Sequence, residues 1–258
     1  MRKIIFTLLQ ILLPILLCYS QEQDSAKSNL IKKTNDFFKD RNIEKEELKY
    51  NGNWAGLEVG FNNYKNSSGE IAAGFLELLP WQSRSASINF SEYNISFVKN
   101  RFGITTGTAL EVNNYKFIRN ITLLPDTAPL KYYTDTVNDF IKNKLSVVYL
   151  SLPILLEFQI PVGKRNKKIF FSAGVIGGLA IDAYTHQIFE KNEKEFKYRV
   201  RGDFFFLPYR YGVTFRMGYS FIRFFANYNL TPLFNENQGP ELYPFSVGIA
   251  IITMLLLL

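Results

Sequence analysis

The stretch RYGVTFRMGYSFIRFFANYNL, Arg210 to Leu230, sets three arginines among aromatic and aliphatic residues. Just before and within it, apolar or amphipathic residues occupy every second position: Leu207, Tyr209, Tyr211, Val213, Phe215, Met217 and Tyr219. The intervening positions are polar or small: Pro208, Arg210, Gly212, Thr214, Arg216 and Gly218. A period of two is typical of a β-strand whose faces meet different surroundings. One face therefore contacts an apolar medium, and the other must solvate guanidinium groups.

The same alternation predicts seven further strands. They cover residues 53–64, 85–98, 102–115, 147–160, 171–184, 222–230 and 243–251. In the second of these, the apolar phase changes near Ser91 and Glu92, which predicts a β-bulge. The eight predicted strands have roughly the length that a tilted strand needs to cross a bilayer.

Short and long connections alternate strictly between the predicted strands. Outer-membrane barrels have short periplasmic turns and longer external loops, so the alternation favours that architecture. We predict an all-β fold, an eight-stranded antiparallel up-and-down transmembrane β-barrel over residues 51–258. Because the strand number is even, the chain enters and leaves the barrel on the periplasmic side. Its external loops are the expected contact surfaces: residues 62–84, 118–144 and 185–205.

The N-terminus MRKIIFTLLQILLPILLCYSQEQ has the pattern of a secretory signal peptide. Two basic residues precede an apolar run, and Ser20 suits cleavage, so residues 1–20 are predicted to be removed. Residues 21–50 are rich in charge and predict a short helical or disordered periplasmic lead-in. Cys18, the only cysteine, leaves with the signal peptide. The alternative is a lipoprotein acylated at Cys18, although Leu17 stands where such signals usually place a small residue.

The chain carries a formal charge of +7, and about +5 once Arg2 and Lys3 are removed. A mild positive excess suits an anionic lipid surface. An exported chain without a recognition motif is not expected to bind nucleic acid.

Charged residues on the polar strand faces are predicted to point into the lumen. They are Glu58, Glu111, Glu157, Asp182, Arg210, Arg216 and Arg223. Buried charge is costly unless it is paired, so we expect an interior salt-bridge network, with glycines on the same face leaving room for the arginines. An eight-stranded barrel is normally filled by side chains, which favours a plugged lumen over a conducting pore lined by these charges.

Aromatic residues gather near the ends of the predicted strands. Six of them are expected to form girdles at the membrane interfaces: Trp54, Tyr115, Tyr149, Tyr209, Tyr219 and Tyr243. The alternative is that strands are simply rich in aromatic residues.

The segments GLEVGFNNY, FGITTGTALEVNNYKF, YLSLPILLEFQ, FSAGVIGGLAI, FFANYNLTPLF and GPELYPFSVGI resemble the PorT-like outer-membrane β-barrel family of Gram-negative bacteria. The resemblance covers about residues 53–251. It implies an outer-membrane location and no assigned enzymatic activity, cofactor or catalytic residue. Members usually end on a terminal aromatic residue that assists the barrel-assembly machinery, whereas this chain ends IITMLLLL.

Catalytic and metal chemistry finds little support in the sequence. His186 is the only histidine, without an evident serine or other orienting partner for a lipid-modifying enzyme. One histidine, no mature cysteine and scattered carboxylates predict no metal site, and no cofactor is expected.

We therefore predict a non-enzymatic cell-envelope protein in the outer membrane, with a structural or interaction role. A narrow pore, or an accessory component of outer-membrane transport or secretion, is the main alternative. The expected partners are outer-membrane lipid, the barrel-assembly machinery and envelope or secretion-complex proteins. A soluble lipocalin-like barrel is the competing fold, and in it Glu58, Arg216 and Arg223 would face solvent.

Overall fold

The computed structural model describes residues 50–71, 74–98, 101–136, 139–162, 167–191 and 193–251. The predicted signal peptide, all of the predicted lead-in except Tyr50, and the C-terminal residues after Ile251 lie outside the described residues. Within the described ranges, no helix is long and apolar enough to cross a membrane.

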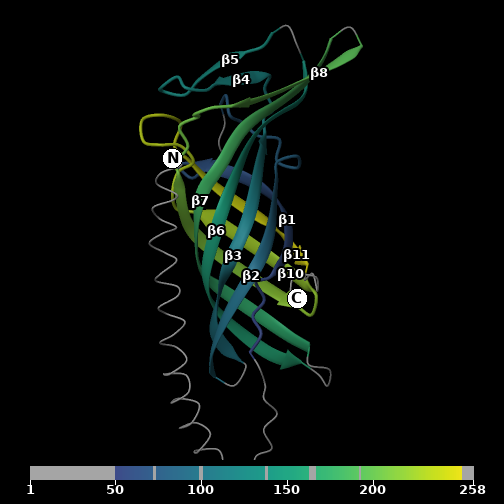
Figure 1. The fold of residues 1–258 in the computed structure, drawn as a ribbon, viewed down its shortest axis with the longest axis vertical. Helices are drawn as coiled ribbons and strands as arrows, with labels where there is room; N and C mark the ends of the chain where they lie inside the picture. The colour runs from purple at the N-terminus through teal and green to yellow at the C-terminus, as the bar shows by residue number, and fades with distance from the viewer. Residues whose placement is uncertain are drawn as a thin grey trace, which may run out of the picture. The chain divides into compact units, whose positions relative to one another are not determined.

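Eight strands form a closed antiparallel barrel (Figure 1). They are β1 (Gly56–Asn66), β2 (Arg84–Val98), β3 (Phe102–Lys116), β6 (Phe140–Val162), β7 (Lys167–Lys191), β9 (Tyr209–Tyr219), β10 (Ile222–Asn229) and β11 (Leu242–Ile251). Each pairs with its neighbours in chain order, and pairing of β1 with β11 closes the ring. The predicted eight-stranded up-and-down barrel is confirmed. We call the end with the turns β2–β3, β6–β7 and β9–β10 the short-turn end. The end with the connections β1–β2, β3–β6, β7–β9 and β10–β11 is the long-loop end.

The outer face of the barrel is apolar and the inner face is polar. Along β9, for example, Val213, Phe215 and Met217 are exposed while Thr214 and Arg216 are buried. Such a wide band of exposed aliphatic and aromatic side chains is typical of a lipid-facing surface. A soluble lipocalin-like barrel would have the opposite arrangement, with aliphatic residues inside.

The pairings β2–β3 and β6–β7 contain four register shifts, and two of them lie where they decide which of the predicted residues face the lumen. One lies in β2 between Asn89 and Ser91, next to the predicted site. The other was not predicted: Val148 and Tyr149 are consecutive in β6, yet they pair with Asp182 and Ala180, so Ile181 is the extra residue in β7. Because side chains alternate along a strand, one extra residue turns all later side chains to the other face.

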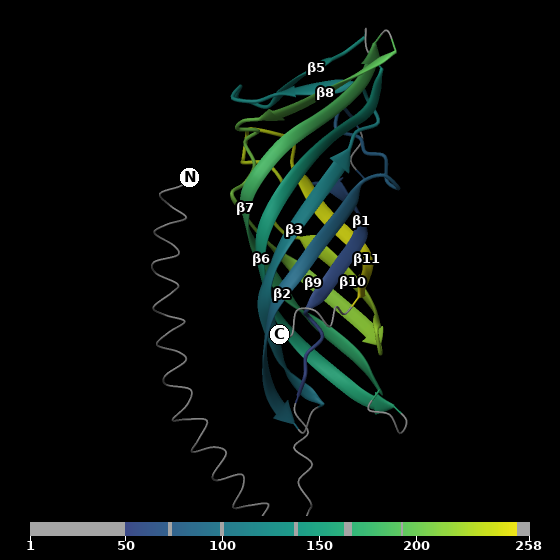
Figure 2. The same ribbon diagram turned by 45° about the vertical axis from the view of Figure 1, so that its right-hand side comes forward.

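The long-loop end has structure of its own (Figure 2). β4 (Ile121–Leu124) and β5 (Lys131–Thr134) form a separate hairpin. Among the described strands, β8 (Lys194–Arg201) pairs with the distal part of β7 alone. Much of the sequence predicted as the loops 118–144 and 185–205 is therefore strand. We call the hairpin and the segments 74–83, 117–120, 202–208 and 230–241 the cap.

Candidate functional site: the filled lumen

The chain enters the barrel before its first strand begins. Residues 50–55, which we call the lumen segment, run inside the wall at the short-turn end. Tyr50 and Trp54 are both buried. Burial raises the pKa of Tyr50 to about 12, with a smaller contribution from the carboxylate of Glu157, so its phenol stays neutral at physiological pH.

Polar side chains from two wall strands, β2 and β10, hold the backbone of the lumen segment. The Glu92 carboxylate accepts hydrogen bonds from the amides of Trp54, at 2.7 Å, and Ala55, at 2.8 Å. The Arg223 guanidinium donates to the carbonyl oxygens of Asn53, at 2.7 Å, and Ala55, at 3.2 Å. These bonds take the place of strand pairing for a segment that lies inside the ring.

A second set of bonds fixes the segment to β6. The side-chain amide of Asn53 donates to Glu157 Oε1 at 2.5 Å, and Gln159 Nε2 donates to the same oxygen at 2.6 Å. Gln159 Nε2 also donates to the Asn51 carbonyl at 2.6 Å. Glu157 is fully buried and receives amide donors in place of a cation.

Trp54 fills the middle of this end of the lumen. Its ring packs with Ala109, Leu155 and Ile176 in a small buried apolar cluster. The guanidinium of Arg216 lies over the ring at 4.3 Å, a cation–π contact. The indole therefore lies between the apolar cluster and the Arg216 guanidinium.

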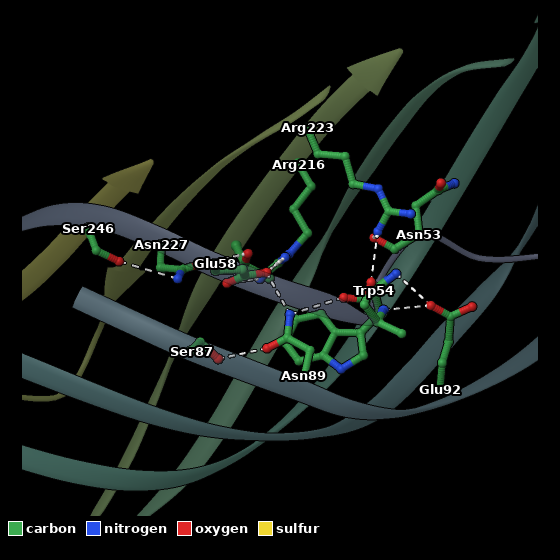
Figure 3. A network of polar contacts seen from close by, with 12 residues as sticks. Asn53, Trp54, Glu58, Ser87, Asn89, Glu92, Arg216, Arg223, Asn227 and Ser246 are labelled. Carbon is green, nitrogen blue, oxygen red and sulfur yellow. Dashed lines mark hydrogen bonds and ion pairs between the residues drawn. The ribbon is translucent and has the colours of Figure 1, made fainter. Parts of the chain in front are cut away.

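A buried ion pair lies beside the tryptophan (Figure 3). Arg216 donates through Nη1 to Glu58 Oε1 and through Nη2 to Glu58 Oε2 at 3.4 Å. Asn89 Nδ2 donates to Glu58 Oε1 at 2.7 Å and to the Trp54 carbonyl at 3.0 Å. Both charged side chains are almost completely buried, so each supplies most of the other's stabilisation in place of water.

A second buried pair crosses the lumen toward the long-loop end. Arg210 donates through Nη1 to Glu111 Oε1 at 3.0 Å and through Nη2 to Glu111 Oε2. Ser151 accepts from Arg210 Nη2 at 2.9 Å, and Asn113 donates to Glu111 at 2.7 Å. The guanidinium also lies 4.1 Å from the Tyr149 ring centre. Strands from opposite sides of the ring are therefore tied together through its interior.

An apolar cluster closes the long-loop end. Its residues come from both the barrel wall and the cap: Tyr64, Leu76, Leu78, Tyr115, Phe117, Ile121, Leu123, Leu130, Leu145, Val147, Tyr149, Phe204, Leu233, Phe234 and Leu242. The cap therefore has a packed hydrophobic core that continues into the barrel. From one end to the other, the lumen holds the polar lumen segment, Trp54, two ion pairs and this cluster.

Comparison with known proteins identifies the family. The family model described as "Outer membrane protein beta-barrel domain" matches residues 49–235, more than half of the chain. The chain belongs to this family. No curated protein and no solved structure matches it. The outer-membrane location that the sequence predicted follows from this membership.

Six of the seven predicted charges lie in the lumen of this outer-membrane barrel. They form two separate ion pairs and two contacts with the lumen segment, whereas a single salt-bridge network was predicted. Glu58 pairs with Arg216 and Glu111 with Arg210, whereas Glu157 and Arg223 bind the lumen segment.

Asp182 is the exception, and its predicted position in the lumen is wrong. It forms an ion pair with Arg201 of β8 at 3.1 Å, with the arginine side chain 61% exposed. The bulge at Ile181 turns Asp182 to the outer face.

The predicted aromatic girdle is wrong for three of its six residues. Trp54, Tyr115 and Tyr149 are buried inside the outer-membrane barrel, whereas Tyr209 and Tyr219 lie exposed on the outer face. Tyr243 is half-buried in β11. Strand parity separates the two groups: Trp54 shares the parity of Glu58, Tyr115 that of Glu111, and Tyr149 that of Glu157.

His186 lies in β7 directly opposite Lys144 of β6 and Arg199 of β8. Lys142, Lys144, Lys197 and Arg199 surround it with positive charge, and among the described residues no carboxylate hydrogen-bonds to it to orient it as a general base. Within the described residues, no group of three or more His, Cys, Asp or Glu side chains is placed to hold a metal ion.

Gly107 makes room for the lumen segment. A Cβ atom there would lie 2.1 Å from the Ser91 carbonyl oxygen and 2.6 Å from Trp54 Cδ1. We expect Gly107→Ala to lower the free energy of unfolding by about 1–3 kcal/mol, because overpacking forces the ring or the backbone to move. Urea unfolding of the barrel refolded in detergent micelles measures the effect.

Gly177→Ala is the matched control for this substitution. The nearest atom to an added Cβ at Gly177 is 3.9 Å away, so the change should alter stability by no more than about 0.5 kcal/mol. Equal effects of the two substitutions would contradict close packing of Trp54 against β3.

Proposed function

We propose that this outer-membrane protein is a closed, non-enzymatic barrel with a structural or interaction role at the cell envelope. The observation that supports the proposal is a lumen filled by side chains, apart from a small cavity of about 10 Å³ beside Glu111 and Arg210. Both arginine–glutamate pairs, Trp54 and the apolar cluster of the cap occupy the path that ions would need. A conducting barrel needs a continuous water-filled channel, which larger barrels provide.

The cap is the proposed contact surface. Its packed core, which includes Phe204, Leu233 and Phe234, gives the long connections a defined shape. Defined loops on a rigid scaffold are where proteins usually place binding residues. With the usual barrel orientation, the long-loop end faces the exterior and the lumen segment enters from the periplasm. Envelope or secretion-complex proteins are the partners that we propose for this surface.

Within the outer-membrane family we propose the PorT-like assignment, on the resemblance of six strand segments. The same proposal includes export by a signal peptide at residues 1–20 in a Gram-negative envelope. Cleavage at Ser20 is tested by the N-terminal sequence of the protein isolated from outer membranes. A mature chain that begins at residue 21 supports the proposal, and one that begins at an acylated Cys18 supports the lipoprotein alternative.

Conductance in planar lipid bilayers tests the closed barrel. We expect the full chain to insert without discrete channel openings. Openings whose ion selectivity changes in Arg216→Gln, a lumen residue, but not in Arg201→Gln, on the outer face, would replace this proposal with the narrow pore.

A further inference from the structure

Four adjacent strands place cationic or titratable side chains in one row near the long-loop end. Lys116 of β3 lies opposite Lys144 of β6, Lys144 opposite His186 of β7, and His186 opposite Arg199 of β8. Directly opposed residues of antiparallel strands point to the same face, with Cβ atoms about 5 Å apart. We call these four residues the basic row; Figure 1 shows the strands β3, β6, β7 and β8 that carry it.

The basic row lies on the face of the barrel that contacts lipid further down. Lys116 continues the outward column of Ile104, Leu110 and Val112 in β3, and Lys144 continues the column of Leu150 in β6. Val112 and Val148 form the last apolar pair, and the next pair is Asn114 with Ser146. The lipid face therefore changes from apolar to polar to basic within a few residues.

The height of the row matches the headgroup region. Lys116 is four residues beyond Val112, about 13 Å along the strand. A strand tilt of 35–45° reduces this to about 10 Å along the membrane normal. The polar headgroup region extends several ångströms above the hydrocarbon on each side, and a lysine side chain reaches across the remainder.

The row has neutral partners within the chain. Lys116 Nζ donates to Gln82 Oε1 at 2.5 Å, Lys144 Nζ donates to Asn114 Oδ1, and the Arg199 guanidinium lies 3.6 Å from the Tyr184 ring centre. Among the described residues, none of the three cations forms an ion pair. The neighbouring carboxylates are engaged elsewhere, Glu195 with Lys197 and Asp182 with Arg201.

Like charges directly opposite one another destabilise a sheet. A row that keeps them together, without carboxylates, fits a ligand that supplies negative charge from outside the chain. Three inter-strand spacings of about 4.8 Å make the row about 14 Å wide, enough for more than one phosphate group. Lysine and arginine are the side chains that bind phosphate best.

We propose that the basic row binds the phosphate groups of an anionic glycolipid in the outer leaflet. Lys142, one row further from the membrane, adds positive charge to the same face. This inference rests on the proposed orientation, with the long-loop end outside, but not on whether the lumen conducts.

Lipid retention by the full chain tests the proposal. The protein is refolded in detergent micelles with lipid A carrying both phosphates, or with the same lipid after dephosphorylation, and bound lipid is counted by native mass spectrometry. We expect the phosphorylated lipid to be retained and the dephosphorylated lipid to be lost. The triple variant Lys116→Gln/Lys144→Gln/Arg199→Gln should bind about 100-fold more weakly, since each cation near an anionic surface contributes roughly a factor of five.

A control variant removes the same charge elsewhere at the long-loop end. Lys131→Gln/Lys191→Gln/Lys194→Gln changes one exposed residue of β5 and two at the tip of the β7–β8 hairpin, and should bind like the unmodified protein. Equal binding by both triple variants, or equal retention of the two lipids, would overturn the proposal. So would full competition by millimolar inorganic phosphate, which would assign the row to the free ion. None of these outcomes affects the closed-barrel proposal, because conductance is measured separately.

Discussion

Replacing Arg216 by methionine is expected to lower the free energy of unfolding by about 3–5 kcal/mol. The substitution leaves the Glu58 carboxylate buried in the lumen with only Asn89 as a side-chain donor. It also removes the cation that lies over the Trp54 ring. The measurement is urea unfolding of the refolded barrel, with the heat-induced shift in gel mobility as a second readout.

Two further variants separate the ion pair from a general effect of the substitution. In Glu58→Gln/Arg216→Met neither position carries a charge, and the glutamine can still accept the bond from Asn89, so most of the lost stability should return. Arg201→Met removes the exposed pair with Asp182 and should cost at most about 1 kcal/mol. A cost for Arg216→Met no larger than that for Arg201→Met would contradict a stabilising role of the lumen pair.

The barrel itself could be predicted from the sequence because its strands obey a local rule. Each residue of a spanning strand faces either lipid or lumen, so the two environments leave a period of two in every strand. The stretch around Arg216 carries the pattern without interruption, and the structure keeps it in register from Tyr209 to Tyr219. Chain order then fixes the neighbours, because the connections are short at one end.

The interior could not be predicted to the same depth, because it depends on contacts between residues distant in sequence. Asn53 reaches Glu157, and Arg223 reaches the carbonyl groups of Asn53 and Ala55. Nothing local to residues 50–55 indicates that they pass inside the ring. The bulge at Ile181 is equally hidden, since Leu179 and Ile181 continue the apolar phase of the strand and Asp182 follows on its polar phase. Asp182 was misplaced for that reason.

The two tryptophans of the chain give the sharpest test of the lumen segment. Trp54 is 1% exposed within the barrel, and Trp81 is 76% exposed in the connection between β1 and β2. We expect Trp54→Ala to lower the free energy of unfolding by about 3–5 kcal/mol, because it leaves a cavity among Ala109, Leu155 and Ile176. Trp81→Ala loses one edge contact with Phe61 and should change stability by about 1 kcal/mol or less.

Fluorescence of the remaining tryptophan makes the comparison independent of the energies. With Trp81 replaced by phenylalanine, emission from Trp54 should be blue-shifted and protected from acrylamide in the aqueous phase, because the ring is enclosed by β3, β6 and β7. With Trp54 replaced instead, Trp81 should be quenched readily. If Trp54 responds to lipid-soluble quenchers while acrylamide leaves it unaffected, the ring lies at the membrane interface. In that case the girdle expected from its position at the strand end would be right and the lumen assignment wrong.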